Sequence, residues 1–145
     1  MAEQLKLSNQ VCFPVYMLAK EIVSRYRPFL EELGLTYPQY LVLLVLWEED
    51  GQTLSQIGEK LHLDSGTLTP LLKRMEQKHI IVRTRNSTDE RSVNITLTPQ
   101  GKDLREKALA VPKQLIDAMK VPLEELSQFK NRIDHLLSIL DKRVE

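Results

Sequence analysis

The apolar positions of this chain recur mostly at helical spacing, and residues that begin or end helices separate them. An apolar-rich segment over residues 8–30 predicts a first helix, and Gly34, a residue type common just past helix ends, closes it. Thr36 and Gln39 have the spacing of a capping box, so a second helix is expected to begin there. Residues 40–47 are all apolar, which predicts that this second helix is buried on every side.

Two short helices joined by a tight turn are expected next. Thr53 and Gln56 repeat the capping-box spacing, and apolar residues then recur three and four positions apart. Residues 62–66 are rich in side chains that bond their own backbone, and a further helix is predicted over residues 65–78. Pro70 is expected in the first turn of this helix, because a proline deeper inside would remove a hydrogen bond.

A β-hairpin is predicted after this pair of helices. Residues 80–85 and 92–97 are rich in β-branched side chains, and residues 86–91 between them have the composition of a turn. Alternation in the second run places Val93, Ile95 and Leu97 on one face, which is typical of a sheet packed on one side. The predicted fold is therefore mainly α with a small β-hairpin wing, in the order of a winged helix-turn-helix.

The remaining residues predict long helices with uncovered apolar stripes. Thr98 and Pro99 begin a helix expected to reach about Lys120, with a kink or break at Pro112. A last helix follows Pro122, and its apolar stripe contains Leu123, Leu126, Phe129, Ile133, Leu136, Leu137 and Leu140. We interpret residues 1–34 and 99–145 as a helical dimerisation region of a homodimer, and residues 35–98 as a DNA-binding region.

Length and composition restrict the possible classes of protein. The chain has 145 residues, of which 42% are apolar, as expected for one globular domain. No apolar run reaches the roughly 18 residues that a bilayer requires, and no secretory signal is recognised at the amino terminus. We therefore expect a cytoplasmic protein with no membrane partner, no metal and no other cofactor. That compartment would keep Cys12 reduced, and because Cys12 is the only cysteine it cannot form an intrachain disulfide.

Charge is balanced overall but uneven along the chain. The formal net charge is zero, yet residues 73–105 carry eight basic and four acidic side chains. Taken alone, such an excess is typical of a solvated surface. Here it coincides with the predicted second short helix and wing, where cations could meet double-stranded DNA in its major and minor grooves. The candidate DNA-binding residues are Ser65, Thr67, Thr69, Lys73, Arg74, Arg83, Arg85, Asp89 and Arg91; Asp89 would hold Arg91 by a charge-assisted bond.

Three segments together resemble the MarR family of winged-helix regulators. They are residues 63–76, residues 89–91 in the wing, and residues 35–40 upstream; the likeness runs from about residue 7 to residue 101. It is strongest to the branch, OhrR, that senses organic hydroperoxides through one cysteine. In this branch a cysteine at the position of Cys12 reacts with the peroxide. The resemblance also implies that Tyr16, Tyr26 and Tyr37 support the thiolate, with Tyr26 and Tyr37 coming from the partner subunit.

The chemistry of such a sensor sets physical requirements. A thiol with an ordinary pKa of about 8.5 must become a thiolate near neutral pH, which a helix amino terminus and phenolic donors favour. Pro14 should break an early helical bond, so Cys12 is expected in a kinked or late-starting first turn. With no second cysteine to resolve it, the oxidised form would pass through a sulfenic acid to a mixed disulfide with a low-molecular-weight thiol, or cyclise onto a backbone nitrogen.

We therefore expect a redox-sensing transcriptional repressor that binds operator DNA when Cys12 is reduced and releases it after oxidation by organic hydroperoxide. An alternative is a MarR-type regulator that responds to a small phenolic ligand, which release without an oxidant would favour. A thiol peroxidase is a weaker alternative, because no resolving cysteine is present and a sensor needs one turnover. A pure interaction module would bind no DNA. The sequence favours a regulator over an enzyme.

Overall fold

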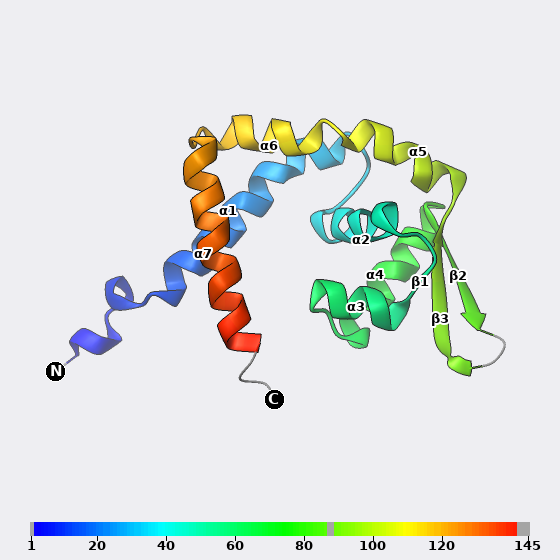
Figure 1. Cartoon of the computed structure of the whole chain (residues 1–145), viewed down its shortest axis with the longest axis horizontal. Helices are drawn as coiled ribbons and strands as arrows, with labels where there is room; N and C mark the ends of the chain where they lie inside the picture. The colour runs from blue at the N-terminus through cyan, green and yellow to red at the C-terminus, as the bar shows by residue number, and fades with distance from the viewer. Residues whose placement is uncertain (1, 87–88, 142–145) are drawn as a thin grey trace.

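The computed structural model describes residues 2–86 and 89–141, without the side chains of residues 86 and 89–91. Figure 1 shows a compact lobe joined to an arm of long helices. The lobe contains α2 (Tyr37–Glu48), α3 (Leu54–Leu61), α4 (Ser65–Gln77) and a small sheet. The arm contains α1 (Cys12–Glu31), α6 (Val111–Met119) and α7 (Leu123–Asp141), and α5 (Pro99–Ala108) connects the two parts. This arrangement confirms the predicted fold class.

Helix α1 begins later than expected. Two short 3-10 turns, η1 (Glu3–Leu5) and η2 (Leu7–Asn9), precede it, and its first residue is Cys12 rather than a residue near Ser8. Pro14 consequently falls in the first turn, where a helix does not need the missing N–H. The start near Ser8 that the apolar spacing predicted is thus wrong, and the late-starting first turn that Pro14 predicted is confirmed. At the other end Gly34 adopts a φ of +70°, as a residue following a helix often does.

The helices of the lobe begin where local capping predicts. Thr36 and Gln39 form a complete capping box at α2, and Thr53 and Gln56 form another at α3. Helix α2 lies at the centre of the core, but Leu44 is 41% exposed, so the prediction of burial on every side is wrong at that position. The core side chains with the least exposure include Leu30, Val42, Leu43, Leu46, Ile57, Leu68, Leu72, Met75, Ile81, Ile95 and Val111.

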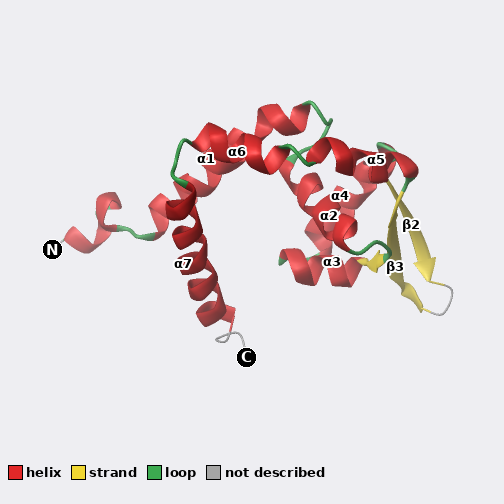
Figure 2. Ribbon diagram, turned by 45° about the horizontal axis from the view of Figure 1, so that its top comes forward, coloured by secondary structure: helices red, strands yellow, loops and turns green. Residues whose placement is uncertain are grey.

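The sheet has one strand more than the sequence predicted. Strands β2 (Ile81–Asn86) and β3 (Asp89–Leu97) form the expected antiparallel wing, which projects beside α4 (Figure 2). Strand β1 (Gln52–Thr53) pairs with the other edge of β3, so the strand order is β1-β3-β2. Strand β3 also begins three residues earlier than expected. Ile95, on the predicted inner face, is fully buried and faces the core.

Pro70 is the sixth residue of α4, so its predicted place in the first turn is wrong. Its ring nitrogen cannot donate to the carbonyl of Gly66, four residues earlier. Both residues are exposed, so water can bind the carbonyl oxygen instead. The helix therefore tolerates a proline on its solvent-facing side.

The carboxyl-terminal helices break where proline predicts. Thr98 caps α5 through its hydroxyl, and the expected long helix divides into α5 and α6, with Pro112 in the first turn of α6. The apolar stripe of α7 is largely exposed; Leu123 is 66% and Leu140 56% exposed. In the part of the chain that the structure describes, no helix combines the length and apolar character of a membrane span.

Candidate nucleic-acid interface and cysteine site

Helix α4 presents a polar face to solvent. Leu68, Leu71, Leu72 and Met75 are buried against the lobe. Helical geometry then turns Lys73 to the opposite side, where it is exposed. The other polar residues predicted to bind DNA from α4 lie on or beside this outer face; Ser65, Thr67 and Arg74 are exposed, and Thr69 is partly buried. Helix α4 thus brings together five of the predicted contacts.

The amino terminus of α4 is fixed by its cap. The carboxylate of Asp64 accepts a hydrogen bond from the backbone N–H of Thr67 at 2.7 Å. This bond, together with the Thr67 hydroxyl, holds the pKa of Asp64 below its ordinary value. Asp64 is therefore a carboxylate near neutral pH, and its charge favours the positive end of the helix dipole. The sequence analysis did not single it out, although aspartate is a common cap residue.

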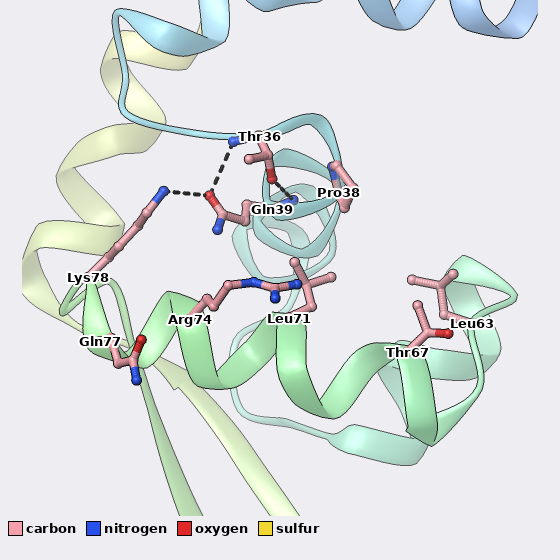
Figure 3. Close-up of a pocket in the computed structure, with 9 residues that line it drawn as sticks. All are labelled: Thr36, Pro38, Gln39, Leu63, Thr67, Leu71, Arg74, Gln77 and Lys78. Atoms are coloured by element: carbon pink, nitrogen blue, oxygen red, sulfur yellow. Dashed lines mark hydrogen bonds between the residues drawn. The ribbon is translucent and has the colours of Figure 1, made fainter.

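A hollow separates α4 from the start of α2. Its volume is about 680 Å³, and α4 contributes Thr67, Leu71 and Arg74 to its lining (Figure 3). Thr36, the cap residue of α2, and Pro38 and Gln39 in its first turn line the opposite side, and Lys78 lies at one end. Arg74 thus lies on the flank of α4 that faces α2, whereas Lys73 lies on the outer face.

The wing carries the remaining predicted DNA contacts. Arg85 is exposed on β2, but the guanidinium of Arg83 is bound to the carboxylate of Glu76 on α4. Asp89 and Arg91 belong to the backbone of β3 near the hairpin connection, and their side chains lie outside the described part of the structure.

Cys12 occupies the first position of α1 with an exposed thiol. Tyr16 follows one turn later and is 61% exposed, and the ammonium group of Lys20 lies 5.1 Å from its ring centre. The sulfur is therefore open to solvent at a helix amino terminus. Within the described residues, no three His, Cys, Asp or Glu side chains gather as a metal site would require.

Tyr26 and Tyr37, which the family resemblance implied as supports for the partner's thiolate, are in contact with each other. Their ring centres are 4.8 Å apart, and Tyr40 joins them at 5.8 Å from Tyr26. Burial, with smaller contributions from the two neighbouring phenols, raises the pKa of Tyr26 to about 12. Burial also raises the pKa values of Tyr37 and Tyr40. All three hydroxyls thus keep their protons near neutral pH and can donate hydrogen bonds.

This tyrosine cluster does not meet Cys12 of the same chain. Tyr26 lies fourteen residues after Cys12 in the same helix, which corresponds to about 21 Å at 1.5 Å per residue. Tyr40, which is 3% exposed, was not predicted as part of a site. Its spacing of three residues from Tyr37 was the available signal, since such residues share a helix face.

Residues 19–108 match a family model described as transcriptional regulator SarA/Rot. The sequence is also 47% identical to an organic hydroperoxide resistance transcriptional regulator of Bacillus subtilis (strain 168), over 97% of this chain and 96% of that one. The chain belongs to the MarR family of winged-helix transcriptional regulators. Among solved structures, this MarR-family chain resembles reduced AbfR bound to DNA, with a TM-score of 0.81 and 41% identity over 99% of this chain and 98% of that chain. Its TM-score with disulfide-formed AbfR is 0.63, at 40% identity over 99% and 95% of the two chains.

Membership of the MarR family confirms the resemblance that the sequence motifs indicated. The named relatives are transcriptional regulators, which agrees with the expected class of protein. The roles of Cys12, of the tyrosines and of the individual DNA contacts stay predictions. What the geometry adds is a set of exposed polar groups on α4, an exposed cysteine at the start of α1, and a phenol cluster that lies far from the cysteine of the same chain.

Proposed function

We propose that this MarR-family protein is a homodimeric redox sensor that represses transcription. It binds operator DNA while Cys12 is reduced and releases the DNA after an organic hydroperoxide oxidises Cys12. The observation that carries the proposal is the exposed position of this single cysteine at the amino terminus of α1. The similarity to an organic hydroperoxide resistance regulator of Bacillus subtilis and to reduced AbfR bound to DNA supports it.

The DNA-binding part of the proposal uses α4 and the wing. Helix α4 would enter the major groove with Ser65, Thr67, Thr69, Lys73 and Arg74 directed to bases and phosphates. Arg85 and Arg91 on the wing would reach the minor groove or its phosphates, and Asp89 would hold Arg91 by a charge-assisted bond. For Arg83 we propose an indirect contribution, because Glu76 already binds its guanidinium. Two copies of α4, roughly 34 Å apart, would read a near-palindromic operator.

The second copy of the chain would cover the exposed apolar residues of the arm. Val11, which precedes α1, is 78% exposed, and Val15 and Met17 on α1 are 64% and 49% exposed; the stripe on α7 is exposed as well. Exposed apolar surface of this extent is typical of an interface. Pairing the arms would bring Tyr26 and Tyr37 of one subunit to Cys12 of the other, so that neutral phenols donate to the thiolate.

The proposed oxidation is a two-electron step. The Cys12 thiolate attacks one oxygen of the hydroperoxide, the O–O bond breaks, and an alcohol leaves after taking up a proton. The resulting sulfenic acid then condenses with a low-molecular-weight thiol, which forms a mixed disulfide and releases water. Cytosolic thiols would supply this partner and keep unreacted Cys12 reduced. One event per subunit suffices for a switch, so the protein need not act as an enzyme.

Mobility-shift titration of operator DNA with wild-type protein and the Cys12→Ser variant tests the proposal. Both proteins should bind when reduced, and only the wild type should release DNA after stoichiometric cumene hydroperoxide. Mass spectrometry of the released protein should place the added mass on the peptide that contains Cys12. Release of Cys12→Ser by the hydroperoxide would refute the proposed trigger.

A further inference from the structure

Lys78 connects the carboxyl-terminal end of α4 to the junction between α1 and α2. Its ammonium group donates hydrogen bonds to the backbone carbonyl of Gly34 at 2.7 Å and to Oε1 of Gln39 at 2.9 Å. Figure 3 shows the lysine reaching across from α4 to the glutamine. Lys78 is the residue that follows α4, so its cation also lies at the negative end of the helix dipole.

Gln39 is unusual among the polar side chains of this chain because it is 2% exposed. Its Oε1 accepts a second hydrogen bond, from the backbone N–H of Thr36 at 3.1 Å. The backbone N–H of Gln39 in turn donates to the Thr36 hydroxyl at 3.4 Å. The same oxygen therefore serves the cap that begins α2 and the bond from α4. If the first turn of α2 moves, the hydrogen bond from Lys78 to Gln39 must lengthen or Lys78 must move with it.

Tyr37 is the first residue of α2 and lies between the two residues of this capping box. Its ring packs against Tyr26, with 4.8 Å between ring centres. A continuous set of contacts thus runs from the tyrosine cluster through the first turn of α2 to Lys78 and α4. Packed side chains and hydrogen-bond networks of this kind can transmit coupling between two sites.

We propose that Lys78 is a positioning residue that couples the oxidation state of the cysteine site to the orientation of α4 on DNA. The inference rests on the proposed function, since it requires Tyr37 to contact Cys12 of the partner subunit. Displacement of Tyr37 after oxidation shifts the start of α2, and the Gln39–Lys78 bond passes that shift to the end of the recognition helix. Lys78 acts through α4 and need not touch DNA.

The measured quantity is the ratio of the operator dissociation constant after cumene hydroperoxide treatment to that of the reduced protein. In Lys78→Met this ratio should fall by about two- to thirtyfold relative to wild type, the range expected for residues within a coupling network. Lys78→Arg, which keeps donors for both acceptors, should restore most of the ratio.

Lys73→Met is the matched control, because it removes a lysine from the outer face of the same helix. It should weaken binding in both oxidation states and reduce the salt dependence by about one unit while leaving the ratio unchanged. Thermal unfolding of each variant checks that the fold is retained. A wild-type ratio in Lys78→Met would overturn this inference alone. Failure of the wild type to release DNA would overturn the proposed function, and this inference with it.

Discussion

Arg83 in β2 donates three hydrogen bonds to the carboxylate of Glu76 in α4. The backbone N–H binds Oε2 at 2.9 Å, and Nη2 and Nε bind Oε1 at 3.0 and 3.3 Å. This paired contact ties the first strand of the wing to the proposed recognition helix. It also neutralises a guanidinium that would otherwise be free to bind phosphate.

Arg83→Met should therefore affect DNA binding differently from loss of a phosphate contact. The salt dependence of binding should change by well under one unit, because the Arg83 charge is already paired, whereas Lys73→Met should reduce it by about one unit. Titration of operator DNA at several salt concentrations measures both slopes. A loss of a full unit in Arg83→Met would place this guanidinium on the DNA backbone.

The same contact predicts a dependence of stability on pH. The backbone hydrogen bond from Arg83 is the main reason that the pKa of Glu76 lies below its ordinary value of 4.5, with the guanidinium adding to the effect. The ionised Glu76 therefore stabilises the folded protein above pH 4.5, and this stabilisation is lost as the pH falls through the lowered pKa of Glu76. Thermal unfolding between pH 7 and 3 should show a smaller acid-induced loss in Glu76→Gln. Identical pH profiles for the two proteins would contradict this assignment.

Gly101→Ala should destabilise the junction between α5 and the sheet. A Cβ at this position would lie 2.1 Å from the backbone carbonyl oxygen of Ile80, and the carbonyl of Gly101 accepts the Trp47 indole N–H at 2.9 Å. Separating these backbones should cost about 1–3 kcal/mol of unfolding free energy in chemical denaturation. Gly66→Ala is the control, because its Cβ meets nothing closer than 3.4 Å and should change stability by less than about 1 kcal/mol.

Tyr26→Phe tests whether the phenol cluster supports the sulfur. The pKa of about 12 keeps the Tyr26 hydroxyl protonated, so it can donate to a thiolate at any pH below that value. Removing this donor should slow alkylation of Cys12 by iodoacetamide near neutral pH by up to about tenfold, a factor that corresponds to 1.4 kcal/mol. Tyr40→Phe is the matched control within the cluster. Unchanged alkylation in Tyr26→Phe would separate the cluster from Cys12.

The helices were predictable where their signals are local. The capping boxes of Thr36 and Thr53 and the cap of Thr98 each involve residues three apart, and all three begin helices in the structure. Strand β1 was missed because it has two residues and exists through its pairing with β3, about forty residues later. The start of α1 was placed too early because apolar spacing continues into the preceding 3-10 turns.

The residues of the candidate site also differ in whether a local sequence pattern predicts them. Helical periodicity alone identified the exposed face of α4, since burial of Leu68 and Met75 fixes the position of Lys73. The Lys78–Gln39 contact joins residues 39 positions apart, and no local pattern predicts it. The choice of Tyr26 and Tyr37 as thiolate-supporting residues came from resemblance to a family, and no local pattern predicted that their rings are in contact.

The distance along α1 from Cys12 to Tyr26 has a consequence for mixed populations of subunits. In the proposed homodimer each sulfur uses tyrosines from the opposite chain. In a heterodimer of one Cys12→Ser subunit and one Tyr26→Phe subunit, one cysteine site therefore contains both substitutions. The other cysteine site contains neither and is intact. Co-expression of these two individually defective alleles should restore part of the peroxide response, which is complementation between alleles of one gene.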